Sequence, residues 1–163
     1  MDEAQLDQLG AAIAEALPGV VTGHSVAHGM LTLIADTAKI VEVVIFLRDD
    51  PRCRFINFTD ITAVDYPGRQ HRFEVVYHFY STLHFGRVRL KTRVAEQDPT
   101  VDSLVPLYGS ARFMERECHD MYGIVFRGNA DLRPILLYEG FVGHPLRKDY
   151  PKHREQPLVP YRK

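Results

Sequence analysis

The most regular hydrophobic pattern of the chain lies in RFEVVYHFYSTLHFGRVRLKTRV, residues 72–94. Each half alternates apolar and polar residues, which is the period-two pattern of a strand with one buried face. We therefore predict strands at residues 72–80 and 87–94, paired as a hairpin with one face in the core and one in water. The core face is expected to hold Phe73, Val75, Tyr77 and Phe79 from the first strand and Val88, Leu90 and Val94 from the second.

The second strand of this hairpin also carries four cations on its other face: Arg87, Arg89, Lys91 and Arg93. Three interpretations stay open: an edge or solvent-facing strand whose charge prevents aggregation, an acidic protein partner, or a nucleic-acid backbone. The hairpin aromatics share the face of Val75 and therefore indicate core rather than a base-stacking surface. Nucleic acid is accordingly the weakest of the three interpretations.

Around the hairpin, the pattern predicts helices and further strands. Apolar residues at helical spacing predict a helix over residues 3–17, closed by Pro18-Gly19, and a second helix capped by Asp36 and stopped at Asp49-Asp50-Pro51. A third helix fits residues 111–122, with Gly123 as its left-handed C-cap. Two further strands are expected, at residues 30–35 and 55–66. Residues 1–126 therefore predict an α+β domain of two layers, a mainly antiparallel sheet packed by helices.

Residues 127–163 differ from this domain and read as an extended tail. They hold five of the ten prolines, with eight Lys/Arg and four Asp/Glu, so the tail has a net charge of +4 and the rest of the chain −5. Such a segment cannot build its own core. We expect it either to be disordered or to lie on a surface that something else provides.

Composition excludes several classes of protein. The net charge of −1 over 163 residues argues against a wholly basic nucleic-acid binder, and no apolar run approaches the roughly 18 residues that cross a bilayer. The first ten residues lack the pattern of a secretory or organelle-targeting leader. Two cysteines, Cys53 and Cys118, cannot form a disulfide framework or a four-cysteine zinc site. We infer a reducing compartment and a bacterial or organelle-encoded origin.

The candidate catalytic and metal sites are weak. His24 and His28 would share a face of a helix, but Gly23 and Gly29 indicate a loop, and no third ligand is near. Cys118 belongs to the apolar stripe of its predicted helix, so it is expected in the core rather than as a nucleophile paired with the adjacent histidine. Glycine-rich nucleotide motifs and paired cysteines for an iron–sulfur cluster are missing from the sequence.

The predicted third helix also carries an acidic cluster, Glu115, Glu117, His119 and Asp120. Carboxylate-bridged metal sites use a Glu and a His three residues apart, whereas Glu115 and His119 are four apart. We interpret the cluster instead as i,i+4 pairs, Glu115 with His119 and Arg116 with Asp120, along a solvated or interface face.

The run MERECHDMYGIVFRGNADLRPILLYEGFVGHPLRKDYP, residues 114–151, resembles the C subunit of NADH:quinone oxidoreductase, the thirty-kilodalton (30 kDa) subunit family of respiratory complex I. The matching motifs are Glu115-Arg116-Glu117, Asp120 through Ile124, Asp131-Leu132-Arg133 and Gly143 through Pro151, and the nine-residue block at the end is the most specific. Upstream, TAVDYPGR, RFEVVYHFYS and RVRLKTRV are also similar to the family, so the resemblance covers roughly residues 40–151. The chain departs from the family pattern at residues 128–130, Pro134 and Phe113.

The resemblance implies a non-catalytic structural and assembly subunit in the hydrophilic arm of a proton-translocating complex, where the tail docks on partner subunits. FMN, iron–sulfur clusters, NADH and quinone would be bound by other subunits, and none by this chain. Expected partners are the large quinone-site subunit and the neighbouring cluster-bearing subunits, with no nucleic acid and membrane contact only through the complex. The expected location is the cytoplasmic side of the bacterial inner membrane, or the matrix side if the chain is organelle-encoded.

The interface residues expected from these motifs are Glu115, Arg116, Glu117, Asp120, Arg133, His144, Arg147, Lys148, Asp149 and Tyr150. Arg133, Arg147 and Lys148 are expected to form charge-assisted hydrogen bonds with partner carboxylates or carbonyls. Two alternatives remain open: the equivalent subunit of a membrane-bound hydrogenase-type complex, and a standalone RNA-binding module.

Overall fold

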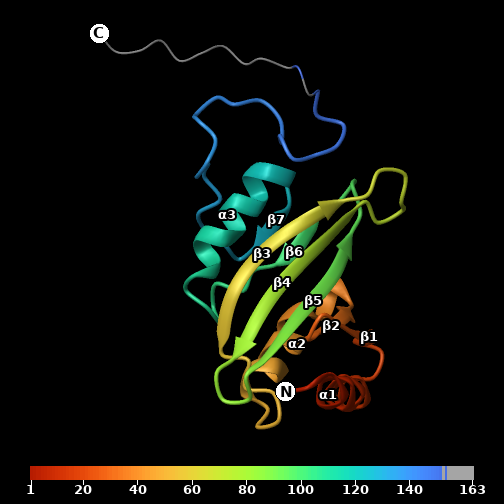
Figure 1. Ribbon diagram of the computed structural model, residues 1–163. Coiled ribbons are helices and arrows are strands. Elements are labelled where there is room, and N and C mark those ends of the chain that lie inside the picture. The colour runs from red at the N-terminus through yellow and green to blue at the C-terminus, as the bar shows by residue number, and fades with distance from the viewer. Residues whose placement is uncertain (152, 154–163) are drawn as a thin grey trace.

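The computed structural model describes residues 1–151 and 153 as an α+β fold (Figure 1), which confirms the predicted fold class. The helices are α1 (Glu3–Ala16), α2 (Ile40–Asp49) and α3 (Ala111–Tyr122), with a short 3-10 turn at Thr37–Lys39. The strands are β1 (Val21–Ala27), β2 (Met30–Ala35), β3 (Asn57–Asp65), β4 (Phe73–Ser81), β5 (Gly86–Val94), β6 (Thr100–Asp102) and β7 (Val125–Arg127).

Five strands form the main sheet in the order β1-β2-β5-β4-β3. All neighbours are antiparallel except β2 and β5, which run parallel. The predicted hairpin is therefore present and lies in the middle of the sheet. This corrects one interpretation of the basic stripe: β5 is a central strand, so its cations do not protect a sheet edge.

One face of the main sheet and the three helices enclose the core. The residues predicted for the core face of the hairpin are all buried, and they pack in one cluster with the apolar stripes of α1 and α2 and with Cys118 of α3. Asp2 caps α1 through a capping box with Gln5. Asp36, predicted as the cap of the second helix, accepts a hydrogen bond from the Ala38 amide and caps the 3-10 turn that leads into α2.

Two short pieces of sheet were not predicted. Gly23 and Gly29 led us to predict a loop around His24 and His28, but residues 21–27 form β1. His28 and Gly29 both take positive φ angles and close a two-residue hairpin to β2. The His24 and His28 side chains therefore do not share a helical face. The parallel pair of β6 and β7 was also missed, since three-residue strands show no periodicity.

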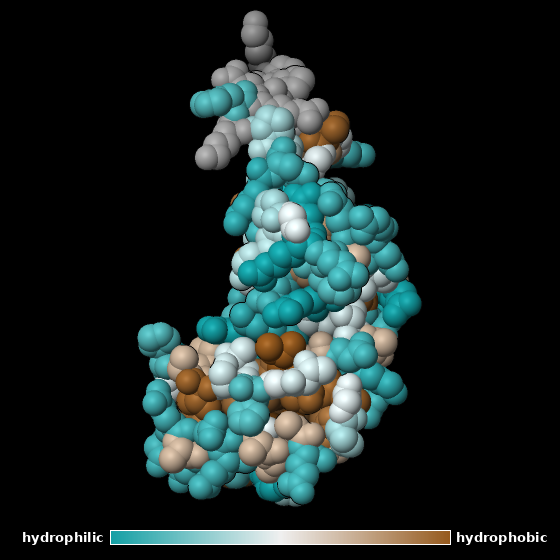
Figure 2. All heavy atoms as spheres, turned by 90° about the vertical axis from the view of Figure 1, so that its right-hand side faces the viewer, coloured by the Kyte–Doolittle hydropathy of each residue, from teal (hydrophilic) through white to brown (hydrophobic). Residues whose placement is uncertain are grey.

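Figure 2 shows how surface polarity is distributed on one side of the molecule. Hydrophilic side chains dominate its upper half, near the tail, while apolar atoms gather in the lower half, at the height where α1, β1 and β2 lie in Figure 1. In the part of the chain that the structure describes, no helix is both long and apolar enough to cross a membrane.

Candidate functional site

Residues 128–150 of the tail lie against α3 and the adjoining end of the sheet (Figure 1). We expected the tail to be disordered or to lie on a surface that something else provides. For residues 128–150, the chain's own domain provides that surface. The predicted boundary between domain and tail, after residue 126, falls inside β7. Residues 152 and 154–163 of the predicted tail lie outside the described residues.

The tail first caps the C-terminal end of α3. The last carbonyls of a helix have no partner inside the helix and need donors from elsewhere. Here the His144 Nδ1–H donates to the carbonyl of Asp120 (2.9 Å), the Leu146 amide to Met121 (3.1 Å) and the Arg147 Nε–H to Tyr122 (2.6 Å). The Arg147 guanidinium also brings positive charge to the negative end of the helix dipole.

Gly123 makes this close approach possible. It is the predicted left-handed C-cap, with φ +74°, and a Cβ at this position would lie 2.5 Å from both the Arg147 Nη2 and the His144 Nε2. The residue therefore serves two purposes, because the backbone conformation favours glycine and the tail packs where a side chain would stand.

Replacing Gly123 with alanine is expected to detach residues 144–147 from α3 as well as to strain the backbone. The left-handed conformation alone costs about 1–2 kcal/mol for a residue with a Cβ. Hydrogen exchange should show faster exchange at the Leu146 amide, and thermal unfolding should show a lower Tm. An alanine at Gly140, whose φ is also positive but whose Cβ would meet nothing within 4 Å, separates the two effects. Equal exchange at Leu146 in both variants would contradict the close-packing argument.

Asp120 anchors the middle of the tail. Its buried carboxylate accepts hydrogen bonds at Oδ2 from the amides of Ile135 (2.7 Å), Leu136 (2.9 Å) and Leu137 (3.3 Å). Three amides converging on one carboxylate fix the path of the backbone there.

Glu115 anchors the start of the tail from the interior. The side chain is fully buried, and its carboxylate accepts from the Ser103 hydroxyl (2.8 Å), the Leu104 amide (2.7 Å) and the Asn129 side-chain amide (2.9 Å). Burial raises the pKa of Glu115, and the three hydrogen bonds oppose that rise by stabilising the ionised form. The carboxylate thus joins α3 to the segment after β6 and to the tail.

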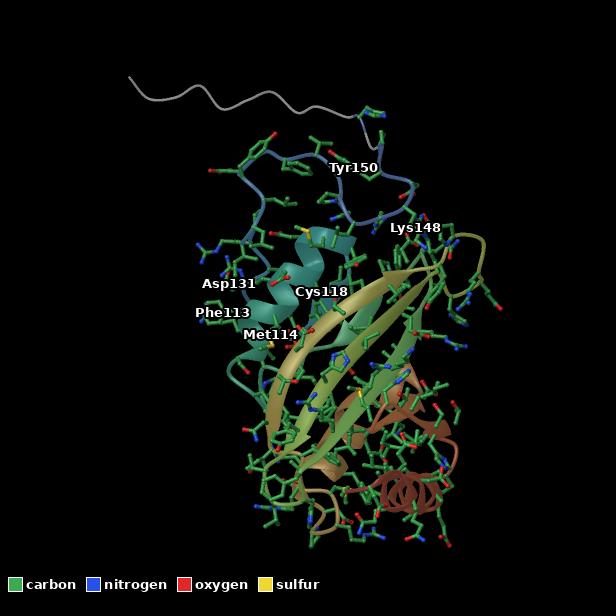
Figure 3. All side chains as sticks on the ribbon, in the orientation of Figure 1. Phe113, Met114, Cys118, Asp131, Lys148 and Tyr150 are labelled. Atoms are coloured by element: carbon green, nitrogen blue, oxygen red, sulfur yellow. The ribbon has the colours of Figure 1, made fainter. Side chains whose placement is uncertain are left out.

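Arginines around Asp131 complete this contact. Arg133 (2.6 Å) and Arg112 (3.0 Å) both donate to the Asp131 carboxylate and hold its pKa well below the usual range. Arg116 donates instead to the backbone carbonyls of Arg133 (2.9 Å) and Pro134 (2.8 Å). Figure 3 shows Asp131 beside α3, on the same side of the molecule as Phe113.

The predicted i,i+4 pairs along α3 are therefore wrong. Glu115 points into the interior, and His119 donates its Nδ1–H to the Ile124 carbonyl (2.8 Å). Arg116 and Asp120 each bind the backbone of the tail rather than one another. Pairs of side chains along a helix are expected where that face is open to water. Residues 128–150 pack on α3, so its polar side chains bind the tail instead.

The far end of the tail is held by a buried arginine, Arg72. Its guanidinium forms a bidentate pair with Asp65 (2.8 Å for both hydrogen bonds) and also reaches Glu96 (2.6 Å) and Asp149 (2.8 Å). The Lys148 amide donates to the same Asp65 carboxylate (2.8 Å). The hydrogen bonds from Arg72 are the main reason that the pKa of Asp65 and the pKa of Asp149 are lowered. We call these residues the Arg72 clamp.

The remaining predicted interface residues take different positions. Glu117 is exposed on α3, and the exposed Lys148 ammonium lies 5.9 Å from the ring centroid of Tyr66. Tyr150 stacks on Phe141 with ring centroids 6.0 Å apart. Figure 3 shows Lys148 and Tyr150 at the returning end of the tail, above the strands. Of the residues predicted from charge, most are thus bonded within the chain.

The surface that the tail presents outward is apolar, and sequence reasoning missed it. Its exposed large apolar side chains between residues 135 and 146 are Ile135, Leu136, Tyr138, Val142 and Leu146. We call residues 135–146 the apolar strap; Glu139 is the only Asp, Glu, Lys or Arg within it. The apolar run PILLYEGFV is visible in the sequence. Only the structure shows that its side chains are exposed, while the charged groups on either side are bonded within the chain.

Both cysteines are poor ligands and nucleophiles. Cys53 and Cys118 are buried and unbridged, which confirms the core position predicted for Cys118. Burial raises the pKa of Cys53 to about 12 and raises that of Cys118 as well, so both stay as thiols at neutral pH. Among residues 1–151 and 153, no group of three or more His, Cys, Asp or Glu side chains could hold a metal ion.

Comparison with known proteins agrees with the motifs of the tail. The family described as "Respiratory-chain NADH dehydrogenase, 30 Kd subunit" matches residues 33–156. The C subunit of the NADH-quinone oxidoreductase of Rhodopseudomonas palustris (strain TIE-1) is 55% identical over 151 residues, covering 93% of this chain and 74% of the relative. The corresponding C subunit from Caulobacter vibrioides is 51% identical over the same length, covering 75% of that relative.

Solved structures share the fold. A trypsin-resistant fragment of Nqo5 superimposes with a TM-score of 0.65 at 27% identity, covering 78% of this chain and 99% of the fragment. A chain of an archaeal membrane-bound sulfane sulfur reductase has a TM-score of 0.76 at 23% identity, covering 90% of this chain and 86% of its own length, and at that identity it shows the fold alone. The predicted resemblance is confirmed: the chain belongs to the 30 Kd subunit family of the respiratory-chain NADH dehydrogenase.

Proposed function

We propose that this chain is a non-catalytic assembly subunit of the peripheral arm of a proton-translocating NADH–quinone oxidoreductase, and that it docks there through the apolar strap. FMN, iron–sulfur clusters, NADH and quinone are held by other subunits in this proposal. The partners are the large quinone-site subunit and its cluster-bearing neighbours, on the cytoplasmic side of the membrane. Membership of the family supports the assignment to this oxidoreductase. The two buried cysteines, whose pKa values are raised, support a non-catalytic role for the chain.

One observation carries the docking part of the proposal. The charged groups that flank the strap are bonded within the chain, at Asp120, Asp131 and the Arg72 clamp, while the strap's apolar side chains remain exposed. Exposed contiguous apolar side chains held on a fixed backbone are typical of interaction surfaces. Because the strap is already ordered on its own domain, docking costs less conformational entropy than folding a free tail would.

The hydrogenase-type alternative receives less support. Relatives with 47–55% identity are named as the C subunit of NADH-quinone oxidoreductase. We therefore favour the NADH–quinone oxidoreductase.

Replacing Leu136 with aspartate tests the strap. Leu136 is 61% exposed, so the fold should tolerate the change, whereas placing a carboxylate in an apolar interface should reduce recovery of the chain with the redox subunits at least about tenfold. The measurement is co-purification of the tagged chain from membranes, quantified against NADH–quinone reductase activity. Leu83→Asp is the matched control, since Leu83 is 65% exposed on the β4–β5 turn.

Equal loss in both variants would show that the strap is not a specific docking surface. The same preparations test the wider proposal. NADH oxidation by the purified chain alone, or a stable wild-type complex that holds no flavin or iron–sulfur protein, would overturn it.

A further inference from the structure

The main sheet has a second face, opposite the core, on which the basic stripe of β5 lies. Register places Arg89 between His78 of β4 and Thr32 of β2, and Lys91 between Val76 and Ile34. Most of these side chains are half-buried or exposed, and none joins the core cluster that includes the three helices. Figure 3 shows nitrogen atoms gathered in front of the middle of the sheet. We call this the open face.

Two of the four cations of the basic stripe are paired with a carboxylate among the described residues. The buried carboxylate of Glu74 on β4 accepts from Lys91 Nζ (2.8 Å) and Arg93 Nε (3.4 Å). For Arg87 and Arg89, by contrast, no carboxylate oxygen of the described residues comes within 4.0 Å. The two cations without a carboxylate partner therefore lie toward the start of β5.

Arg89 is held in place by a neutral partner. Its Nε–H donates to His78 Nε2 (3.2 Å), which requires that this nitrogen be unprotonated. Burial, and then the nearby Arg89 charge, lower the pKa of His78, so the imidazole is a neutral acceptor at neutral pH. The contact orients the guanidinium without cancelling its charge.

A groove of about 420 Å³ runs across the open face beside these arginines. A register irregularity between Phe58 and Asp60 occurs in β3 where the groove crosses it. The lining includes apolar side chains and two groups of opposite charge, Arg87 on β5 and Asp60 on β3. Its lining residues are Met30, Thr59, Asp60, His78, Phe79, Tyr80, Arg87 and Val88.

We propose that this groove binds an acidic segment of a neighbouring subunit, with one Asp or Glu side chain held by Arg87 and Arg89. The inference rests on the proposed function, which supplies neighbouring subunits, and it adds a second surface distant from the strap. A guanidinium is the side chain that best matches a carboxylate. Arg87 lines the groove, Arg89 lies two residues further along the same face of β5, and neither is paired with a carboxylate of the described residues.

Charge favours a carboxylate segment over nucleic acid. A phosphate backbone needs a track of unpaired cations, whereas Lys91 and Arg93 are already paired with Glu74, and Asp60 adds negative charge to the groove. A single carboxylate needs only the pair that is left.

Photocrosslinking in the assembled complex tests the proposal. A photoreactive p-benzoylphenylalanine replaces Met30 at the edge of the groove, and the crosslinked peptide is identified by mass spectrometry; the same probe at the exposed Glu42 of α2 is the control. The expected result is a crosslink, specific to position 30, to an Asp- or Glu-containing segment of another subunit. A crosslink to nucleic acid, to lipid or to a segment without acidic residues would overturn the proposal, as would none at all.

The double substitution Arg87→Gln with Arg89→Gln tests the role of the two guanidinium groups. The crosslink yield is expected to fall about tenfold, and the lysine versions should restore part of it. Arg127→Gln, which removes an exposed guanidinium paired with Asp102, should leave the yield unchanged. Unchanged yield in the double variant would overturn the assignment of these arginines. Co-purification of the wild-type chain with the redox subunits is measured first. It tests the proposed function, whereas the crosslinking yield tests the groove, so the two proposals can fail separately.

Discussion

Replacing Arg72 with methionine is expected to lower the free energy of unfolding by about 3–5 kcal/mol, the usual cost of leaving one partner of a buried ion pair alone. Asp65 would keep only the Lys148 amide as a donor at its buried carboxylate, and Asp149 would lose its hold on the domain. Methionine preserves most of the side-chain volume beside Phe73, so the effect reports charge and hydrogen bonds rather than a cavity. Urea unfolding measures it.

The matched control is Arg69→Met. Arg69 stacks on Tyr66 at 3.8 Å from the ring centroid, and no carboxylate of the described residues pairs with it, so we expect a change of about 0.5 kcal/mol or less. Hydrogen exchange should also quicken at the Lys148 amide in the Arg72 variant. An Arg72 variant as stable as the control would show that the Arg72 clamp does not hold the tail.

The clamp also predicts how stability depends on pH. Since the folded-state pKa values of Asp65 and Asp149 are lowered, their stabilisation is complete above the ordinary aspartate pKa of about 4 and is lost as pH falls through the lowered values. The difference in stability between the wild type and the Arg72 variant should therefore shrink below about pH 4. Most of this effect belongs to the buried Asp65, because Asp149 is largely exposed and screened by solvent.

Replacing Glu115 with alanine is the second change expected to have a large effect. Three donors would lose their acceptor, and each buried donor left unsatisfied costs about 1–3 kcal/mol. Glu115→Gln should also lower the free energy of unfolding. The glutamine NH2 group is a donor and would face another donor at one of the two positions where Glu115 has an oxygen. Thermal unfolding and urea unfolding of the full chain measure the loss.

Glu117→Ala is the control on the same helix. Glu117 is exposed two residues further along α3, so its removal should change the free energy of unfolding by no more than about 0.5 kcal/mol. If Glu115→Ala and Glu117→Ala unfolded at the same urea concentration, the buried carboxylate would not be the joint between α3 and the tail.

Some of the fold could be predicted because its pattern is local. The alternation in residues 72–94 places Phe73 and Val88 in the core, and the cap residues Asp36 and Gly123 mark helix ends through their own backbone preferences. The hairpin turn at His28-Gly29 escaped this reasoning, because a glycine signals several kinds of turn and the strand before it has a weak pattern.

The candidate site was predicted in its motifs but not in its contacts. The motif residues Asp120, Arg147 and Asp149 do cluster around the tail, yet they bind this chain's own backbone and Arg72. A charged motif predicts a polar or oppositely charged partner, but it does not tell whether that partner is in the same chain or in another protein. A distant segment of the same chain can supply the partner as readily as another protein can. The donor–acceptor pair of Asp149 and Arg72 is separated by 77 positions.

The sequence by itself determined the family, the sheet-and-helix architecture and the glycine at the end of α3, because each depends on residue types at short, fixed spacing. Only the tertiary structure decided which tail groups remain for a partner. Packing residues 128–150 on α3 captures the charges and leaves Leu136 and Leu146 exposed. Burying an unpaired charge is costly, so charged groups near the domain pair within the chain. The side chains left for a partner are those that the fold has not already bound.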